Sequence, residues 1–405
     1  MQLRNHNNDN TTSNQYDQHA STASPEEKAK RIIVKAGDRL VTSLILDSDA
    51  HRIITTIDDG AVRVYSALTG ALLLTLSGHQ GGVWASALYR NTLVTGATDR
   101  NIRVWDLLTG VCTHVFVAHT STVRTLQIVL PINVNRHNPE QTPKYEPEFP
   151  IIVAGSRDKT VSVWRLPIEE LNDDLVAIEQ KNWLLYQLTG HTQAVRAVAG
   201  EGNLVASASY DTTARIWNSW TGESIHTLFG HEHPLYQVIL DTEHRQCITS
   251  GMDATVRTWS LDTGSSLHVL MGHTSLVGVM RLNAGLLVSA SADGTTQVWD
   301  PVTSERLHIF GNHPPGQGES IQTTQHDGEK LVMGFEGAVQ TWDIRTGELL
   351  HETTGVGSVW QIAYDRRRRV VAFNPPEQEP LDDHNQTYLE ILDYGVPSVP
   401  QASSH

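Results

Sequence analysis

The chain has 405 residues, with 45 acidic and 30 basic side chains and a formal net charge of −15 at neutral pH. This acidic balance argues against nucleic acid as the main partner, because neutralising phosphates requires a basic face. No apolar run approaches the roughly 18 residues of a membrane-spanning helix, so we expect no membrane partner.

The first segment, residues 1–31, is rich in Asn, Gln, Ser, Thr and His and has no basic start followed by an apolar core. This composition predicts a disordered tail rather than a signal peptide, and residues 396–405 are expected to form a second tail. Cys112 and Cys247 stand far apart in no paired spacing. Neither a disulfide framework nor a cysteine zinc site is indicated, and we expect a reducing compartment, the nucleus or the cytoplasm.

A repeat unit recurs between residues 32 and 395. Short apolar strands end in an aromatic residue at intervals of 40 to 59 residues, with an acidic residue six positions earlier, and a Gly-His pair opens several units. The aromatic residues are Tyr65, Trp105, Trp164, Trp217, Trp259, Trp299 and Trp342, and the acids are Asp59, Asp99, Asp158, Asp211, Asp253, Asp293 and Glu336.

These motifs resemble the WD-repeat family, whose members fold as β-propellers of four-stranded blades. Seven marked units and a final unit without the tryptophan imply an all-β, eight-bladed propeller over residues 32–395. We expect the strand around Ile32–Val34 to complete the last blade, and the insertions at 131–150 and 167–181 to form surface loops. The resemblance also implies buried hydrogen-bonded networks, which here would be His79-Thr95-Asp99-Trp105 and His191-Ser207-Asp211-Trp217.

Equivalent repeat positions present their side chains to the same face of such a ring. Five residues after the repeat histidines stand Trp84, Arg124, Arg196, Tyr236 and Gly278, with Trp360 at the matching place of the last unit. Directly before the turn acids stand Asp58, Thr98, Arg157, Tyr210, Met252 and Ala292. Because sister repeats carry other residues at the arginine positions, folding alone does not require arginine there. The alternative is that a nearby acid neutralises each arginine, which then serves only stability.

The sequences "ATDRNIRVWD", "AGSRDKTVSVW", "GHTQAVRAV" and "SASYDTTARIW" are similar to those of the cell-division-control F-box/WD-repeat receptors. Members of that family are substrate-recognition subunits of Skp-cullin-F-box ubiquitin ligases, not enzymes, and they bind phosphothreonine-proline peptides without a cofactor. The resemblance implies that Arg100, Arg124, Arg157 and Arg196 bind phosphate with support from Tyr210. It places Trp84, Thr98 and Thr122 around the proline and the apolar pocket, and it suggests further peptide contacts at Tyr236, Met252, Leu276 and Trp360.

The resemblance does not extend to the F-box, because only a polar tail precedes the first repeat. We therefore expect Skp-cullin components as partners only if an F-box is supplied. A phosphate-independent scaffold that uses the propeller rim and the insertions is the alternative. The arginines at 366–369 are interpreted as a solvated hairpin. We expect no metal site at His226, His231 and His233, and no acid/base pair at Asp173-Asp174 or Asp382-Asp383.

Overall fold

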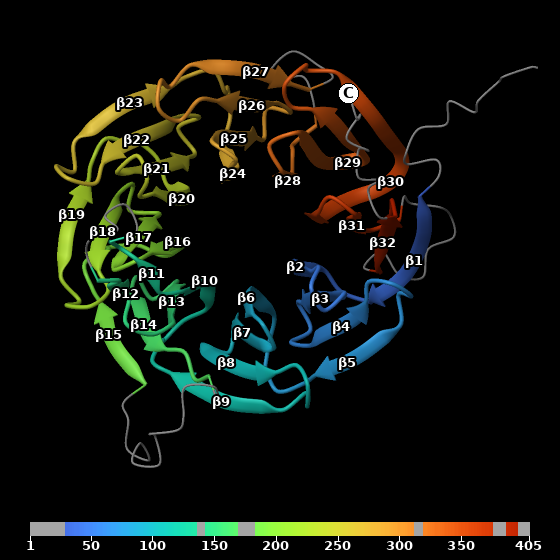
Figure 1. The fold of residues 1–405 in the computed structure, drawn as a ribbon, viewed down its shortest axis with the longest axis horizontal. Helices are drawn as coiled ribbons and strands as arrows, with labels where there is room; N and C mark the ends of the chain where they lie inside the picture. The colour runs from blue at the N-terminus through green and yellow to red at the C-terminus, as the bar shows by residue number, and fades with distance from the viewer. Residues whose placement is uncertain (1–28, 136–141, 169–182, 312–318, 376–385, 396–405) are drawn as a thin grey trace, which may run out of the picture.

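The computed structural model describes residues 29–135, 142–168, 183–311, 319–375 and 386–395. Their strands form a closed ring of antiparallel sheets arranged around a central axis (Figure 1). The predictions for the two tails, for the middle of both insertions and for the two pairs of acids fall wholly or mostly outside the described residues.

Six four-stranded sheets follow one another around the ring, each with its first strand at the inner edge and its last strand at the outer rim (Figure 1). The first three contain β2 (Val41–Asp47), β3 (Arg52–Ile57), β4 (Val62–Ser66) and β5 (Leu72–Leu76); β6 (Val83–Tyr89), β7 (Thr92–Ala97), β8 (Asn101–Asp106) and β9 (Cys112–Val117); and β10 (Val123–Val129), β13 (Ile151–Ser156), β14 (Val161–Arg165) and β15 (Leu184–Leu188).

The next three four-stranded sheets have the same strand order. They contain β16 (Val195–Glu201), β17 (Leu204–Ser209), β18 (Ala214–Asn218) and β19 (Ser224–Leu228); β20 (Leu235–Asp241), β21 (Gln246–Gly251), β22 (Val256–Ser260) and β23 (Ser266–Leu270); and β24 (Val277–Asn283), β25 (Leu286–Ser291), β26 (Thr296–Trp299) and β27 (Arg306–Phe310).

The predicted count of eight blades is wrong, because the described strands form seven sheets around the ring. The seventh sheet is six-stranded, in the order β1-β32-β31-β30-β29-β28, and it takes up both final sequence units. Its long strands β29 and β30 run continuously where two separate units were expected, and the turn acid of the seventh unit is Glu336 rather than an aspartate. The strands are β1 (Lys30–Gly37), β28 (Thr323–His326), β29 (Lys330–Asp343), β30 (Leu349–Tyr364), β31 (Arg368–Phe373) and β32 (Thr387–Asp393).

The N-terminal strand closes the ring, as the sequence predicts. Strand β1 pairs antiparallel with β32, and Ile32, Ile33 and Val34 lie opposite Ile391, Glu390 and Leu389. An ion pair reinforces this closure, because Arg31 Nε donates to the buried carboxylate of Glu390 at 2.7 Å. Arg369 lies 3.6 Å from the same carboxylate.

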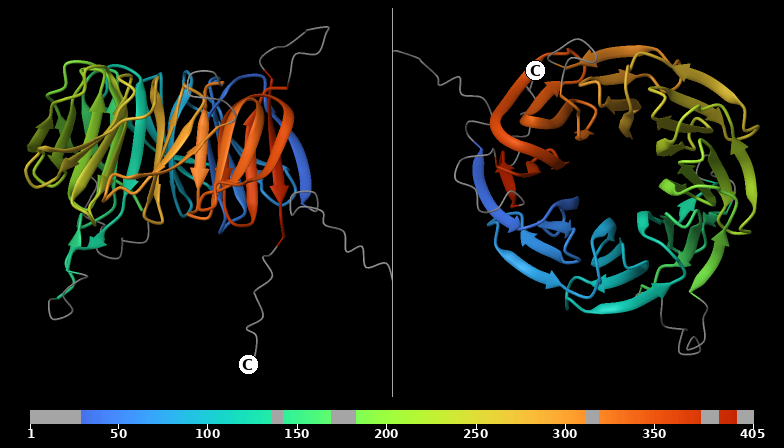
Figure 2. Two further views of the ribbon diagram at one scale, coloured as in Figure 1. Left: turned by 90° about the horizontal axis from the view of Figure 1, so that it is seen from above. Right: turned by 180° about the vertical axis from the view of Figure 1, so that it is seen from behind.

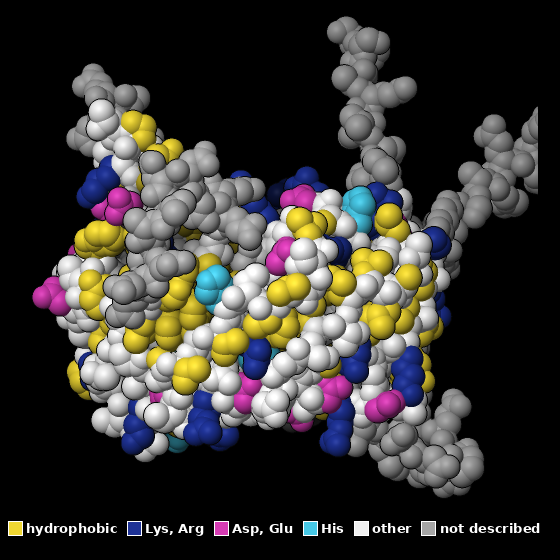
Figure 3. Space-filling view, turned by 90° about the horizontal axis from the view of Figure 1, so that it is seen from below, with side chains coloured by type: hydrophobic (Ala, Val, Ile, Leu, Met, Phe, Trp, Pro, Cys, Tyr) yellow, Lys and Arg dark blue, Asp and Glu magenta, His cyan; other side chains and the backbone are white. Residues whose placement is uncertain are grey.

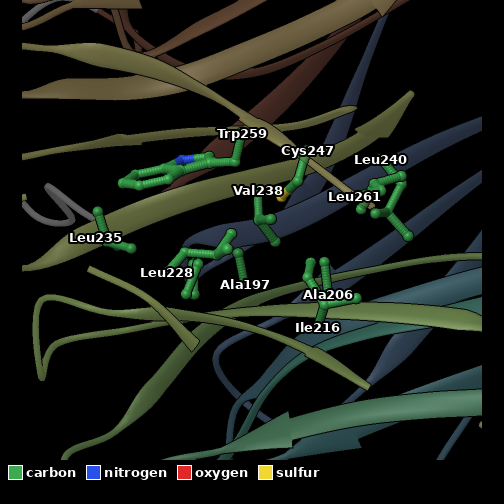
Figure 4. Close-up of a cluster of buried hydrophobic side chains, with 12 residues drawn as sticks. Ala197, Ala206, Ile216, Leu228, Leu235, Val238, Leu240, Cys247, Trp259 and Leu261 are labelled. Carbon is green, nitrogen blue, oxygen red and sulfur yellow. The ribbon is translucent and has the colours of Figure 1, made fainter. Parts of the chain in front are cut away.

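The hydrophobic core is divided among the spaces between neighbouring sheets. Between the β16–β19 and β20–β23 sheets, Leu228, Leu235 and Trp259 pack with Cys247 in a cluster of fully or nearly buried side chains (Figure 4). Burying a large apolar side chain stabilises the fold by about 1.5–3 kcal/mol. Each sheet therefore depends on its neighbours, and the ring fixes the relative positions of the loops at both faces.

The first insertion contributes a two-stranded hairpin, β11 (Ile132–Asn133) and β12 (Tyr145–Glu146), which projects from one face of the ring (Figure 2). It connects the first and second strands of the third sheet. The loops that begin each inner strand and the turns between second and third strands therefore lie on the opposite face, called the upper face below. The rim between the two faces exposes many apolar side chains (Figure 3), including Leu73 on β5 and Val117 on β9.

Candidate functional site

Buried hydrogen-bonded networks fix the upper-face turns. In the fourth sheet, the Asp211 carboxylate lies 2.8 Å from His191 Nδ1, and His191 Nε2 lies 2.8 Å from Ser207 Oγ. Trp217 Nε1 donates to the same hydroxyl at 2.9 Å. The matching network of His79, Thr95, Asp99 and Trp105 is also present, which confirms both predicted networks.

The third sheet builds the same network with a different hydroxyl. Its second strand carries Ala154 where the neighbouring sheets have Thr95 or Ser207, so His119 Nε2 and Trp164 Nε1 instead share Ser162 Oγ at 2.7 and 2.8 Å. The fifth and sixth sheets use Thr249 and Ser289. The network tolerates a change in the position of the hydroxyl, provided that one is available.

The turn aspartates are held as carboxylates. Burial alone would raise the pKa of Asp211, but hydrogen bonds from His191, Thr213 and the backbone N–H of Thr192 lower it far below its ordinary value of 3.8. Asp158, Asp253 and Asp293 are lowered in the same way. These acids are fully engaged in the turns, which makes them structural rather than catalytic groups.

A repeated backbone hydrogen bond places the residue before each turn acid at the same point of the ring. The N–H of Arg157 donates to Thr122 O at 2.9 Å, and the N–H of Tyr210 donates to Ala194 O at 3.0 Å. The corresponding residues Asp58, Thr98, Met252, Ala292 and Asn374 make the same bond. The predicted equivalence of these positions, called pre-turn positions below, therefore holds in the structure.

The second set of equivalent positions consists of β-bulges. In the second sheet, Val83 and Ala85 pair with adjacent residues of β7, which leaves Trp84 as the extra residue. Bulges redirect a side chain and are frequent beside binding sites. The same register shift singles out Thr42, Arg124, Arg196, Tyr236, Gly278 and Trp360. The sequence shows the common spacing of these residues but not the bulges.

Three arginines and three aromatic side chains come together on neighbouring sheets. The Arg124 guanidinium lies over the Trp84 ring at 4.2 Å, and that of Arg196 lies over the Tyr236 ring at 5.4 Å. Tyr210 and Tyr236 have ring centroids 5.5 Å apart. We call Trp84, Arg124, Arg157, Arg196, Tyr210 and Tyr236 the arginine cluster.

Positive charge accumulates within this cluster. Burial, together with the charges of Arg196 and Arg157, lowers the pKa of Arg124 from 12.5 to about 10, although both tyrosines oppose the shift. Burial and a hydrogen bond with Tyr210 raise the pKa of Tyr236. Arg124 therefore stays charged and Tyr236 stays protonated at neutral pH, and the cluster offers guanidinium and hydroxyl donors to an anion.

Within the described residues, no carboxylate forms an ion pair with Arg100, Arg124, Arg157 or Arg196. Other arginines of the chain are paired, for example Arg52 with Asp47 at 2.7 Å and Arg245 with Asp262. The alternative in which each cluster arginine is neutralised by its own acid is therefore wrong. One acidic side chain of the first sheet does reach the second sheet at the inner edge of the upper face, which we call the upper mouth, because Asp58 lies against Gly82.

The remaining predicted residues lie at upper-face positions of several sheets. Arg100 is exposed in the turn after β7, with a left-handed φ of 73°. Thr98 and Thr122 take part in the pre-turn hydrogen bonds of the second and third sheets, and Met252, at the turn after β21 of the fifth sheet, is 47% exposed. Leu276 directly precedes β24 of the sixth sheet and accepts the pre-turn hydrogen bond from Ala292, and Trp360 on the seventh sheet donates from Nε1 to Asn374 Oδ1 at 3.1 Å. Their assignment as site residues remains a prediction.

The interpretation of residues 366–369 as a solvated hairpin is wrong for two of the four arginines. Arg368 and Arg369 are completely buried. Arg368 pairs with Asp393 at 3.2 Å, while Arg369 donates to Thr353 Oγ1 at 3.0 Å and lies near Glu390. These arginines belong to the closure of the ring, and sequence reasoning missed them because their acidic partners stand on β32, more than twenty positions further along the chain.

Other kinds of site find no support in the described part of the chain. It contains no group of three or more His, Cys, Asp or Glu side chains able to hold a metal ion, and His231 belongs to the network of Asp253. This part of the chain also contains no helix that is long and apolar enough to cross a membrane. The chemistry available at the arginine cluster is the binding of an anionic group flanked by apolar surface.

The chain is similar to known proteins in sequence and in fold. The profile of the WD domain, G-beta repeat, matches residues 70–106, 110–165, 182–218, 222–260 and 264–300. The chain is 38% identical over 383 residues to cell division control protein 4 of Candida albicans, covering 92% of this chain and 54% of that protein. It is 36% identical over 363 residues to WD repeat-containing protein pop2 of Schizosaccharomyces pombe, covering 88% and 49%.

The chain thus spans about half the length of these relatives. A crystal structure of the computationally designed Ika8 protein matches with a TM-score of 0.69 at 24% identity, covering 87% of this chain and 96% of that one, which supports the fold. The similarity to the cell-division-control proteins confirms the resemblance drawn from the sequence motifs. The chain belongs to the WD-repeat family of β-propellers.

Proposed function

We propose that the arginine cluster binds peptides that contain phosphothreonine followed by proline. The observation that carries this proposal is the convergence of Arg124, Arg157 and Arg196 without an acidic partner. Like charges in a partly buried mouth repel one another, and a phosphate of about −1.5 to −2 charge would relieve that repulsion. Arginine also donates two parallel hydrogen bonds to such an oxyanion.

The aromatic members of the cluster suit the residues beside the phosphate. Trp84, with Thr98 and Thr122 nearby, offers a flat apolar surface of the kind on which a proline ring packs. Arg100, in the turn after β7, supplies a further guanidinium donor on the second sheet. On this proposal the protein is a recognition module without a catalytic role, and Tyr236, Met252, Leu276 and Trp360 contact the rest of the peptide.

The relatives suggest the process that this module serves. Two of them are named cell division control protein 4, and we propose that this chain selects phosphorylated proteins for a Skp-cullin-F-box type ubiquitin ligase. Contact with the Skp and cullin components would need an F-box, which the described propeller does not supply. The described residues therefore support only the phosphopeptide-binding part of this proposal.

A titration tests the proposal. A fluorescent phosphothreonine-proline peptide should bind at least about 100-fold more tightly than its unphosphorylated twin, because two or more charged hydrogen bonds contribute about 1.5–3 kcal/mol each. Arg124→Ala and Arg157→Ala should each remove most of this preference. Arg245→Ala is the matched control, because Arg245 is exposed, is paired with Asp262 and lies on the opposite face. Equal binding of the two peptides would instead favour the phosphate-independent scaffold.

A further inference from the structure

The sequence contains one threonine that is directly followed by proline, Thr142 before Pro143. Both residues are exposed and lie in the first insertion, shortly before β12. In the other four-stranded sheets a short turn or loop connects the first strand to the second, so the propeller does not require this dipeptide.

The β11–β12 hairpin holds the dipeptide away from the ring. The N–H of Val134 donates to Lys144 O at 2.9 Å, and Asn135 Nδ2 donates to Thr142 O at 2.8 Å. A residue before proline favours extended backbone conformations, and extended segments are a form in which many domains bind peptides. Thr142 is therefore an exposed residue with an extended backbone, on a hairpin that projects from the face opposite the arginine cluster (Figure 2).

A phosphate on Thr142 would convert this dipeptide into the kind of ligand proposed for the arginine cluster. The unmodified threonine has no charge, whereas phosphothreonine carries about −1.5 to −2. Together with Pro143, it would match the phosphothreonine-proline unit proposed to bind at Arg124, Arg157 and Arg196. The chain would then carry both such a ligand and a site for it.

Ligand and site lie on opposite faces of the ring. The strands that flank the insertion, β10 and β13, have seven and six residues, and they span about 20 Å between the two faces at about 3.3 Å per residue. Because the hairpin points away from the ring (Figure 2), Thr142 cannot reach the arginine cluster of its own chain. It can reach the cluster of a second copy whose upper face meets the hairpin. Such a head-to-tail contact can continue from one copy to the next.

We infer that Thr142 is a site for proline-directed protein kinases, and that the phosphorylated hairpin binds the arginine cluster of a second copy of this chain. The second step rests on the proposed function, and the first does not. In the first step, the kinase transfers the γ-phosphoryl group of ATP to Thr142 Oγ1. The hydroxyl proton passes to the catalytic base of the kinase, the bond between the γ-phosphorus and its bridging oxygen breaks, and ADP leaves.

Mass spectrometry after incubation with a cyclin-dependent kinase and ATP tests the first step. Phosphate should appear on Thr142 in the wild type and should be absent in Pro143→Ala, which keeps the threonine. Thr303→Ala is the matched control, because Thr303 is exposed in a turn between a third and a fourth strand and is followed by serine. That variant should be phosphorylated at Thr142 as the wild type is. A wild type without phosphate on Thr142 would overturn the inference.

Sedimentation velocity tests the second step. The phosphorylated wild type should associate at least about 100-fold more tightly than the unmodified chain, because the contact uses the same charged hydrogen bonds as the peptide. After treatment with the kinase, Arg157→Ala retains the ligand with a weakened site, and Thr142→Ala retains the site without the ligand. Neither should associate strongly alone, but a mixture of the two should form pairs of one copy each and no longer chains.

The inference is overturned if the phosphorylated wild type remains monomeric while it still binds the fluorescent phosphothreonine-proline peptide. It is equally overturned if the two variants fail to pair, or if Thr142→Ala associates as tightly as the phosphorylated wild type. A wild type that binds the phosphorylated and unphosphorylated peptides equally would instead overturn the proposed function.

Discussion

Replacing Arg124 by methionine should stabilise the free propeller while removing phosphopeptide binding. Arg124 is the most strongly perturbed cation of the cluster, because it is partly buried and shares the mouth with Arg196 and Arg157. Methionine keeps an apolar stem over Trp84 and removes the charge. If Arg124 stabilised the fold, the same substitution would lower the free energy of unfolding.

The magnitude follows from two opposing effects. Lowering the pKa from 12.5 to about 10 corresponds to at most about 3 kcal/mol of unfavourable interaction in the charged form, and partial exposure to solvent reduces this figure. The guanidinium lies 4.2 Å from the centre of the Trp84 ring, and this cation–π contact stabilises the fold by about 0.5–2 kcal/mol. Arg124→Met should therefore raise the free energy of unfolding by about 1 kcal/mol.

Urea denaturation of the wild type and the variant measures this difference, and a peptide titration on the same samples measures binding. Arg103→Met is the control: Arg103 stacks over the buried Trp105 at 5.9 Å, so its loss should destabilise the fold and leave phosphate recognition unchanged. A decrease in the unfolding free energy of about 1 kcal/mol or more in Arg124→Met would instead show that Arg124 stabilises the fold.

Three further predictions concern the scaffold and the charge of the site. Asp211→Asn should lower the free energy of unfolding, measured by urea denaturation, by about 2–3 kcal/mol because it weakens charged hydrogen bonds. In the wild type, the stabilisation by the Asp211 carboxylate is complete above the ordinary pKa of 3.8 and should disappear as the pH falls toward the lower pKa of the folded state. A wild type whose stability does not change in acid would contradict this. Burial lowers the pKa of His79 below 6.5, so the unfolded chain binds more protons and stability should fall between pH 7 and pH 5 in melting curves. The fall should be smaller in His79→Gln, and the remainder comes from other buried histidines such as His114 and His326. Removing the ion pair between Arg31 and Glu390 with Arg31→Ala should speed hydrogen exchange in β1 and β32, whereas unchanged exchange would show that this ion pair does not contribute to closing the ring.

Much of the fold could be predicted because the repeated motif indicates the hydrogen-bonded network of each sheet directly. A tryptophan, an aspartate six residues earlier and a histidine at the start of the unit specify one network, and the structure forms that network in every four-stranded sheet from the second to the sixth. The number of sheets could not be predicted in this way. The last two units have degenerate markers, and only strand pairing shows that β29 and β30 merge them into one sheet.

The site was accessible to sequence reasoning only in part. Comparing sister repeats singled out Arg124, Arg157 and Arg196, since it separates what the scaffold needs from what varies. The absence of acidic partners and the contacts with Trp84 and Tyr236 depend on packing across sheets, which the sequence order does not reveal. The bulges became visible only from the strand register.

The most direct test of the central claim is a crystal structure of the chain with a bound phosphothreonine-proline peptide. Phosphate oxygens should lie within about 3 Å of guanidinium nitrogens from Arg124, Arg157 and Arg196, with the peptide crossing the upper face. A phosphate in solvent, or a peptide held on the rim or on the face of the β11–β12 hairpin, would contradict it.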